Sequence, residues 1–580
     1  MCCIIAWGET MILTKLFSGL SLILPDTGCT EPEIKAFSIC KNEPFSFQMA
    51  YKFFDDPETE KNPEELHFYI RLETDLPINT YHVSCVPVMH SYSRIEPKLS
   101  IGMYPDLLLP KNTNAQIVKQ TIRNKPGHRY VEVGEKQSLA AYNDSWRQVW
   151  FAVNEEGDAL PAGCHEIKIS LYDISGNLVG ENGFALEVLD AALPEQTLYY
   201  TNWFHNDCLA DFYDLPLFSE DYYRVFRNFL ETAVKNGMNM VLLPAFTPAL
   251  DTAIGEERMT VQLVTVKKTG DSYAFDFAPM KRYIDEARKA GIRYFEHSHF
   301  FTQWGAAHAP KIVGTENGEY KRLFGWETDS AGEEYKAFLR AYIPAVRAFL
   351  RKEGLEETTL FHMSDEPSDA NFESYQKASA GIRELLAGCT VGDALSDYKY
   401  YRSGLVSTPI ARTNNAGDFV DRCDDLWIYY TGGECYDGLS NRLIQLPRER
   451  NRAMGWQLYW ANAKGFLHWG YNFYYGRLSH GLYDPALDPC CGFANAGTTY
   501  SVYPGRDGKP LQSIHQKIFT DALTDHRALQ LLQSLTSRDT CMALIREYFG
   551  EPSFYNTPKD PETMLNFRMA VNEKIKERIV

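Results

Sequence analysis

Several common functional motifs are missing from this 580-residue sequence. None of its 13 cysteines is paired at the C-x-x-C spacing of zinc and dithiol redox sites. No glycine-rich G-x-G-x-x-G follows the first strand of the repeating βα region, and the phosphate-binding G-x-x-x-x-G-K-[ST] does not occur, so nucleotide binding has no support. The G-x-S-x-G elbow and the H-E-x-x-H metalloprotease motif are also absent.

Basic residues are scarce relative to acidic ones. The chain carries 58 Lys and Arg against 76 Asp and Glu, a formal net charge of −18. This balance argues against nucleic acid or an anionic membrane surface as a partner and favours a neutral or cationic ligand. No apolar run approaches the roughly 20 residues that a transmembrane helix needs, so we expect no membrane insertion.

The N-terminal segment looks only superficially like a secretory leader. It lacks a basic beginning, Glu9 interrupts its first apolar run, and the later run from Leu16 to Leu24 continues into "PDTG" rather than into a small-residue cleavage site. We interpret that run as a strand, and Met11 is an alternative start. Scattered cysteines without an export signal predict a cytoplasmic protein.

Residues 1–193 contain short alternating runs broken by turn residues. Examples are "FSFQMAYKF", "WRQVWFAV" and "HEIKISLYDISGNLVGENGFALEVL", in which "SGN" and "ENG" are hairpin signals. Strands at this spacing predict an antiparallel β-sandwich.

Residues 194–540 alternate between strand and helix patterns, which indicates parallel strands joined by crossovers. About eight such units fit a (β/α)8 barrel of the TIM type better than an open sheet. Seven strands can be identified: "TLYYTNW", "MNMVLLPAF", "IRYFEHSHFF", "TTLFHM", "GDALSDYKY", "DDLWIYYTG" and "GFLHWGYNFYY". Residues 541–580 predict a helical tail packed on the barrel, and Trp456 lies at core spacing within a helix.

Two adjacent carboxylates end the fourth predicted strand, in "TTLFHMSDEPSDANFESYQ". Catalytic groups of such barrels lie at the carboxyl ends of the strands. Because successive strand residues face opposite sides, Asp365 and Glu366 share a cleft only if the chain bends there, and Pro367 makes a bend plausible. The plainer interpretation is that Asp365 or Ser368 caps the next helix while Glu366 is solvated.

Paired acids on a barrel are typical of glycoside hydrolysis, but those acids normally lie on different strands and straddle the scissile bond. Neighbouring acids instead suit substrate-assisted hydrolysis, in which a 2-acetamido oxygen attacks the anomeric carbon. One acid then protonates the leaving oxygen while the other holds the acetamido N–H. Close carboxylates provide two proton affinities, because an ionised partner keeps its neighbour protonated nearer neutral pH.

The sequence resembles glycoside hydrolase family 123, the retaining β-N-acetylgalactosaminidases, over most of residues 195–540. The resemblance rests on "FHMSDEP", "ALSDYKYY", "DLWIYYTGG", "ERNRAMGWQLYWANAKGFLHWGYNFYY" and "TTYSVYPGRDGKPLQSI". It implies a β-sandwich ahead of the barrel, Glu366 as general acid/base and Asp365 as the residue that orients the acetamido group. It implies no cofactor and no metal.

The resemblance also implies that aromatic and polar side chains near the strand ends contact an N-acetyl sugar. The candidates are Trp469, Tyr429, Tyr471, Asp397, Asn202, Trp203, His297 and His299. His297 and His299 are spaced like a metal pair, but no third ligand is evident, so a core or hydrogen-bonding role is favoured. For Asp397, a structural role and a sugar contact are equally supported.

The function expected from these features is an exo-acting retaining glycosidase that removes terminal β-linked N-acetylgalactosamine from a glycan or glycoconjugate. One alternative is a two-carboxylate glycosidase for a sugar without an acetamido group, with Asp397 or Glu434 as the second acid. Another is a catalytically silent carbohydrate-binding protein.

Overall fold

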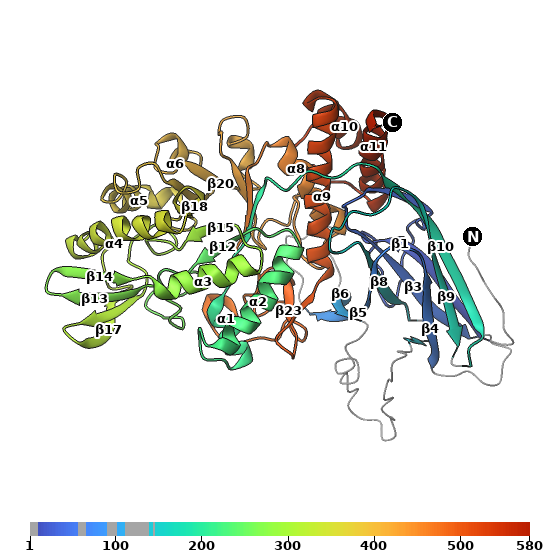
Figure 1. Ribbon diagram of the computed structural model, residues 1–580, viewed down its shortest axis with the longest axis horizontal. Coiled ribbons are helices and arrows are strands. Elements are labelled where there is room, and N and C mark those ends of the chain that lie inside the picture. The colour runs from blue at the N-terminus through green and yellow to red at the C-terminus, as the bar shows by residue number, and fades with distance from the viewer. Residues whose placement is uncertain are drawn as a thin grey trace, which may run out of the picture.

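A computed structural model describes residues 10–55, 65–89, 101–110, 139–142, 145–173 and 175–579. Glu9 and the residues before it, on which the question of a leader depends, lie outside the described residues. Figure 1 shows a region of long strands at one end of the molecule and a barrel with its helices at the other, with α9 (Ile514–Leu535) between them.

The N-terminal region folds into two five-stranded sheets, in the orders β1-β3-β8-β5-β6 and β2-β10-β9-β4-β7. Their strands are β1 Thr10–Ser18, β2 Ala36–Cys40, β3 Phe45–Asp55, β4 Glu65–Glu73, β5 Ile78–Val88, β6 Gly102–Pro110, β7 Leu139–Tyr142, β8 Arg147–Val153, β9 Gly163–Asp173 and β10 Leu178–Leu189. Alternate side chains of both sheets meet in one buried cluster, in which Phe47 of β3 contacts Phe184 of β10 edge-on at 4.9 Å.

Two details of this sandwich differ from the sequence prediction. The strand β2 pairs with β10 in parallel, because the chain crosses to the second sheet after β1 instead of turning back in a hairpin. The "ENG" segment is not a turn. Gly183 lies inside β10, where a Cβ would come within 2.6 Å of the Ile167 carbonyl oxygen, whereas "SGN" does form the turn between β9 and β10.

Eight parallel strands close into the predicted barrel in the order β11-β12-β15-β18-β19-β20-β21-β22. They are β11 Tyr199–Asn202, β12 Met240–Leu243, β15 Tyr294–His297, β18 Thr359–Phe361, β19 Thr390–Leu395, β20 Thr408–Arg412, β21 Trp427–Tyr429 and β22 Gly465–His468. The strand β20 was missed by the sequence reading, because it begins with Thr408 and Pro409 of a Ser-Thr-Pro segment typical of loops.

Helices cover the outside of the barrel (Figure 1). They are α1 Asn206–Tyr213, α2 Glu220–Lys235, α3 Ala278–Lys289, α4 Glu333–Lys352, α5 Phe372–Ala380, α6 Lys399–Arg402, α7 Arg448–Arg452, α8 Met454–Trp460 and α9. Only a 3-10 turn, Ala416–Asp418, joins β20 to β21. Two smaller sheets are inserted: β13 Thr265–Thr269, β14 Ser272–Asp276, β16 Ile312–Glu316 and β17 Glu319–Phe324 form one, and β23 Val502–Pro504 and β24 Pro510–Gln512 form the other.

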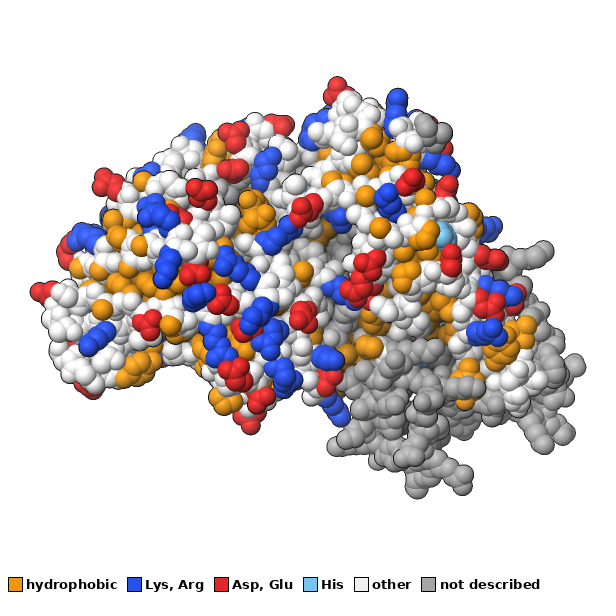
Figure 2. Space-filling model, viewed as in Figure 1, with side chains coloured by type: hydrophobic (Ala, Val, Ile, Leu, Met, Phe, Trp, Pro, Cys, Tyr) orange, Lys and Arg blue, Asp and Glu red, His pale blue; other side chains and the backbone are white. Residues whose placement is uncertain are grey.

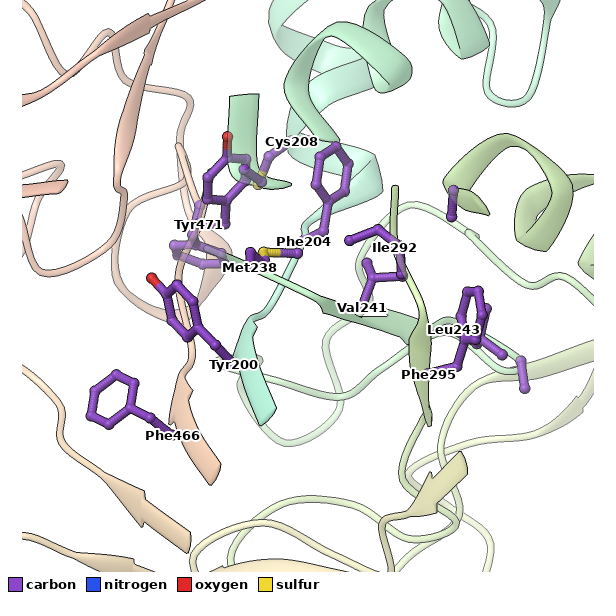
Figure 3. Packing of buried hydrophobic residues seen from close by; sticks show 14 of the residues in the cluster. Tyr200, Phe204, Cys208, Met238, Val241, Leu243, Ile292, Phe295, Phe466 and Tyr471 are labelled. Atoms are coloured by element: carbon purple, nitrogen blue, oxygen red, sulfur yellow. The ribbon is translucent and has the colours of Figure 1, made fainter. Parts of the chain in front are cut away.

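Strand alternation divides the barrel side chains into two cores. Tyr200, Val241 and Phe295 point outward and pack under the helices, as Figure 3 shows. Tyr199 and Leu242, their neighbours in sequence, point into the barrel interior. The two cores explain why each strand reads as a nearly continuous apolar run.

The C-terminal helices α10 (Arg538–Phe549) and α11 (Pro561–Ile579) pack against α9. The helix α11 also contacts β2 of the sandwich, so the tail joins the two regions instead of covering the barrel alone. In this core Trp456 stacks on Phe549 at 4.8 Å, in agreement with its predicted core position.

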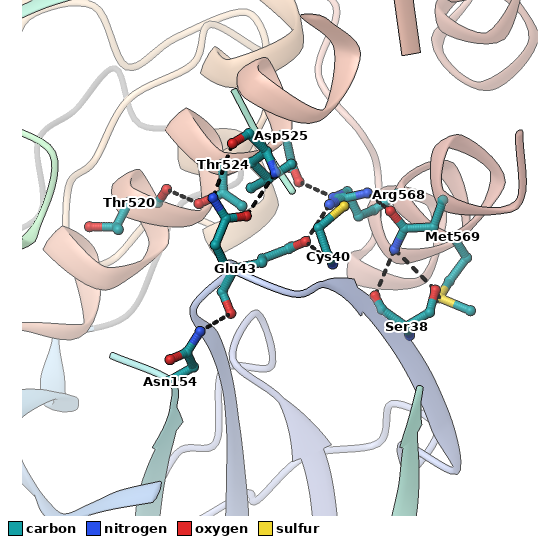
Figure 4. A network of polar contacts seen from close by, with 12 residues as sticks. Ser38, Cys40, Glu43, Asn154, Thr520, Thr524, Asp525, Arg568 and Met569 are labelled. Carbon is teal, nitrogen blue, oxygen red and sulfur yellow. Dashed lines mark hydrogen bonds and ion pairs between the residues drawn. The ribbon is translucent and has the colours of Figure 1, made fainter. Parts of the chain in front are cut away.

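A buried polar network reinforces this junction (Figure 4). The Arg568 guanidinium lies 2.6 Å from the Glu43 carboxylate of the sandwich and 3.1 Å from Asp525 of α9. Asp525 also accepts two hydrogen bonds from Arg452 of α7, at 2.7 and 2.9 Å. Each buried charge therefore faces an opposite one, as charges removed from water require.

The surface drawn in Figure 2 carries interspersed basic and acidic side chains, and its described residues form no continuous basic field. Among the helices of the described ranges, none is both long and apolar enough to cross a membrane.

Candidate active site

The chain leaves the barrel sharply after β18. Glu366 adopts a left-handed φ of 42°, which costs a non-glycine residue about 1 kcal/mol or more. This turn lets Asp365 and Glu366 line the same cavity although they are adjacent in sequence. The expected bend is therefore present, and it lies at Glu366 itself, directly before Pro367.

The cavity has a volume of about 380 Å³ and opens at the carboxyl ends of the strands. Its wall combines residues from the ends of β11, β12, β15, β18, β19, β21 and β22 with a loop that follows β22. The side chains and backbone that form it include Trp203, Leu250, Asp251, Gln303, Trp304, Asp365, Glu366, Ala394, Tyr429, Thr431, Leu467, Trp469, Arg477, Phe493 and Asn495. Three predicted aromatic contacts, Trp203, Tyr429 and Trp469, are among them.

Glu366 is held by the wall opposite the turn. The Tyr429 hydroxyl donates a 2.8 Å hydrogen bond to its Oε1. Burial and the negative charge of Glu366 raise the pKa of Tyr429 well above its usual range, so the hydroxyl stays a donor. Arg412, at the end of β20, forms an ion pair with Glu434 at 2.6 Å and adds positive charge on this side of the cavity.

Asp365 lies in a different environment. Burial, followed by the negative charges of Glu366 and Asp393, raises the pKa of Asp365 well above its usual range, and the nearby His362 only partly opposes this rise. The carbonyl oxygen of Asp365 accepts a 2.8 Å hydrogen bond from the Trp304 N–H. In the free protein, Asp365 is thus the member of the pair that favours the protonated state.

Two predicted sugar contacts point away from the cavity. Asn202 is buried and donates to the Ser501 hydroxyl at 2.7 Å, because strand alternation turns it outward while Trp203 turns inward. Tyr471 follows the end of β22, packs beside Phe204 (Figure 3) and donates to the Phe229 carbonyl at 2.8 Å. It is a core residue under α2.

Neither acid proposed for a two-carboxylate mechanism lines the cavity. Asp397 follows β19, directly precedes the N-cap residue Tyr398 of α6 and accepts the Lys399 backbone N–H at 2.9 Å. Glu434 is buried, where it accepts the Thr431 N–H at 2.7 Å and pairs with Arg412. Asp251, which the sequence reading missed, does line the cavity, and burial raises its pKa.

The two predicted histidines are buried. His297 packs against Phe300 and Phe361 on the outside of the barrel, and its Nε2 lies 2.8 Å from the Tyr342 hydroxyl. His299 lies on the inside, stacked on His362 with ring centroids 4.7 Å apart and planes inclined by 23°. The favoured core role of His297 agrees with this position.

His299, His362 and Asp393 bring possible metal ligands within 4.8 Å of one another. A ligated ion must lie in the plane of each imidazole, where the nitrogen lone pair points, but the planes of two stacked rings do not meet near the rings. Asp393 already accepts two backbone N–H groups and the Tyr375 hydroxyl. The stacking of the two rings disfavours a metal centre, and the buried Nδ1 atoms of His299 and His362 have no hydrogen-bond partner among the described residues.

Some residues of the cavity wall lie in segments without a periodic pattern, so they are not predicted from the sequence alone. Trp304 is 44% exposed at the mouth of the cavity and has a φ of 61° in a short irregular loop. Arg477 and Asn495 come from the long segment after β22. Glu296 lies beneath the cavity. It is predictable from the sequence, because it alternates with His297 in the strand "IRYFEHSHFF".

Comparisons with known proteins agree with this geometry. The family model described as glycoside hydrolase 123, catalytic domain, matches residues 203–532. A family 123 glycoside hydrolase from Clostridium perfringens, whose structure was solved to study glycolipid glycan hydrolysis, is similar over 98% of this chain and 97% of its own, with a TM-score of 0.69 and 12% identity. At that identity the likeness bears on the fold alone.

More distant solved structures include a glycosyl hydrolase family 2 member from Bacteroides cellulosilyticus, with a TM-score of 0.23, 8% identity and coverage of 78% of this chain and 45% of that one. A β-glucuronidase from Parabacteroides merdae has a TM-score of 0.24 and 10% identity over 74% and 46% of the two chains. These two carry no weight. A search of curated proteins finds no match. The match to the catalytic-domain model, over more than half of the chain, shows that this protein belongs to glycoside hydrolase family 123.

Proposed function

We propose that this glycoside hydrolase removes terminal β-linked N-acetylgalactosamine with retention of configuration, using the 2-acetamido group of the substrate as nucleophile. The observation that carries the proposal is the presence of Asp365 and Glu366, adjacent in sequence, in the wall of one cavity. Acids so close together cannot straddle a sugar ring, whereas they can serve two neighbouring atoms of one ring. A cavity of about 380 Å³ suits one terminal sugar and the first part of its aglycone.

The proposed reaction has two steps. The acetamido oxygen forms a bond to the anomeric carbon as the bond to the aglycone oxygen breaks, and Glu366 transfers its proton to that oxygen. Asp365 accepts the acetamido N–H and balances the charge of the oxazolinium ion. Water then attacks the anomeric carbon, the Glu366 carboxylate takes its proton, and the acetamido group is restored.

This scheme requires the pair to share one proton that changes place. In the free protein burial and the neighbouring carboxylates favour a proton on Asp365, and the Tyr429 hydroxyl donates a hydrogen bond to Glu366. An acetamido N–H that donates to Asp365 stabilises the Asp365 anion, so the proton moves to Glu366 when substrate binds. Glu366 then becomes the general acid only in the complex.

A second candidate remains because Asp251 also lines the cavity. With Asp251 as nucleophile and Glu366 as acid/base, the protein would be a two-carboxylate glycosidase for a sugar without an acetamido group. A fluoro-sugar that labels Asp251 covalently would favour this mechanism.

The test is a screen of aryl β-N-acetylhexosaminides, including both the galacto and the gluco epimer. We expect hydrolysis of the galacto compound, inhibition by a thiazoline mimic of the cyclised intermediate, and no covalent adduct on the protein. An inert wild-type protein, or a thiazoline without effect, would contradict the proposal.

A further inference from the structure

We propose that Glu296, His362 and Asp393 form a buried array that fixes the catalytic strand tip and keeps a positive charge beneath Asp365. The inference rests on the proposed function of the Asp365–Glu366 pair. None of the three residues is among those that line the cavity, so they act through Asp365 as positioning residues.

The Asp393 carboxylate of β19 accepts hydrogen bonds from the backbone of the strand tip. Its Oδ1 accepts the Met363 N–H at 2.9 Å and its Oδ2 accepts the Ser364 N–H at 3.1 Å. The Tyr375 hydroxyl of α5 donates to the same carboxylate. Met363 and Ser364 are the two residues before Asp365, and all the bonded groups are buried. A movement of the tip would therefore leave polar groups unpaired.

Glu296 of β15 ties the array to the cavity wall. Its Oε2 accepts the Trp203 indole N–H at 3.0 Å and lies 2.8 Å from His362 Nε2. The Thr201 hydroxyl donates to its other oxygen. A single buried carboxylate therefore orients the indole of the cavity wall and the imidazole below Asp365.

His362 lies between the two carboxylates. Its Nδ1 is 3.6 Å from Asp393 Oδ1 and its Nε2 faces Glu296. Burial alone would lower the pKa of His362, but the Asp393 and Glu296 carboxylates outweigh it and raise the pKa to about 9. The ring is therefore an imidazolium at neutral pH.

The other titratable groups near the ring do not compete for this role. His299 stacks on His362, and burial together with the His362 charge lowers the pKa of His299 well below its usual range. His297 is likewise held neutral by burial. Asp365 on the same strand tip also lies within electrostatic reach of His362, and the His362 charge favours its ionised form.

The array thus sets how easily Asp365 gives up the shared proton. Burial, Glu366 and Asp393 all oppose the Asp365 anion, and His362 is the one group that acts in the other direction on Asp365. Without it, an acetamido N–H would have to ionise Asp365 unaided. The proton would then stay on Asp365, and Glu366 would remain unable to protonate the leaving group.

The first test is the pH profile of His362→Gln on an aryl β-N-acetylgalactosaminide. Loss of the buried positive charge raises the proton affinity of the pair, so both limbs of the profile should move to higher pH by about one unit. At neutral pH kcat should fall about tenfold while KM changes less than twofold. His526→Gln, which removes another buried histidine on α9, should leave the profile in place. A folded His362→Gln protein with an unshifted profile would overturn the proposal.

The second test needs no turnover and so separates this inference from the proposed function. In protein labelled with ¹⁵N-histidine, the His362 ring, assigned by the loss of its signals in His362→Gln, should carry both protons at pH 7.5. Glu296→Gln should lower the pKa of the His362 ring by about one unit or more. A neutral His362 in the wild-type protein at pH 7 would refute the array, whether or not the protein hydrolyses the substrate.

Discussion

Two buried clusters of charged groups lie in this molecule, and their charge balance differs. At the junction of sandwich and barrel, Glu43 and Asp525 face Arg568 and Arg452 at hydrogen-bond distance (Figure 4). Below the cavity, the carboxylates of Glu296, Asp393 and Asp365 gather around the single imidazole of His362. The first arrangement holds two regions of the chain together.

In the second cluster three carboxylates share one basic group. Excess buried charge is relieved by protonation, and a carboxyl group that holds a proton near neutral pH can take part in acid–base chemistry. The backbone strain at Glu366 lies in the same place. Carboxylates that share one basic group are thus gathered at the catalytic strand tip, whereas at the junction Glu43 and Asp525 each face an arginine.

The largest effect is expected for a substitution in the active site. Glu366→Gln removes the proposed general acid, so kcat for an aryl β-N-acetylgalactosaminide should fall by about a thousandfold or more. The melting temperature should not fall, because the variant also removes a like charge beside Asp365. Glu373→Gln, an exposed carboxylate on the helix α5 that follows, is the matched control and should keep full activity. Equal activity of wild type and Glu366→Gln would refute the role of Glu366.

The next largest effect is expected for a substitution at the junction of sandwich and barrel. Arg568→Met leaves Glu43 without its buried counter-charge and Asp525 with Arg452 alone, and should lower the free energy of unfolding by about 3–5 kcal/mol. Chemical denaturation measures the loss. Lys574→Met, which removes an exposed pair with Glu577, should cost less than about 1 kcal/mol. If the junction is purely structural, kcat of the Arg568→Met protein should be unchanged below its unfolding range; a thousandfold loss of kcat there would contradict the division of roles.

The sequence allowed the barrel, the sandwich and the acid pair to be predicted, because each depends on local periodicity or on adjacent residues. It allowed the wall to be predicted only in part. Trp203 and Trp469 were identified, but Asn202 beside Trp203 points outward by strand alternation. The same rule separates Glu296, which points inward, from the predicted His297, which points outward.

Other errors arose where strands end. Alternation could not be extended to Tyr471, because β22 stops at His468 and the chain turns before Tyr471. Asp397 lies past the end of β19, and the carboxylate that contacts the catalytic tip is Asp393 within that strand. Trp304 and Asp251 belong to irregular loops, whose conformation depends on distant packing and leaves no periodic signal.

A smaller effect sharpens the comparison within the cavity. Tyr429→Phe removes the hydrogen bond to Glu366, a charge-assisted bond worth about 1.5–3 kcal/mol, so kcat/KM should fall by about 10- to 150-fold. Tyr430→Phe is the matched control, since the buried Tyr430 hydroxyl has no hydrogen-bond partner among the described residues. Steady-state kinetics of the two variants make the comparison, and equal losses would show that the Tyr429 hydroxyl has no special role.

The smallest effect concerns stability and its dependence on pH. The pKa of Asp365 is raised in the folded protein above its unfolded value of about 3.9, so the protein binds this proton more tightly when folded. The stability that this proton contributes is complete below about pH 4 and is lost as the pH rises through the raised pKa. The Asp365→Asn variant has no titrating group at this position, so its stability does not fall in this way as the pH rises. The free energy of unfolding of this variant should therefore exceed that of the wild type by an amount that grows from pH 5 to pH 8, on the order of 1 kcal/mol at the upper end, as measured by chemical denaturation. Asp285→Asn, which removes an exposed carboxylate paired with Lys281, should show no such growth. A gap that stays constant with pH would mean that Asp365 is already ionised in the free protein, and the cavity would then be as balanced in charge as the junction.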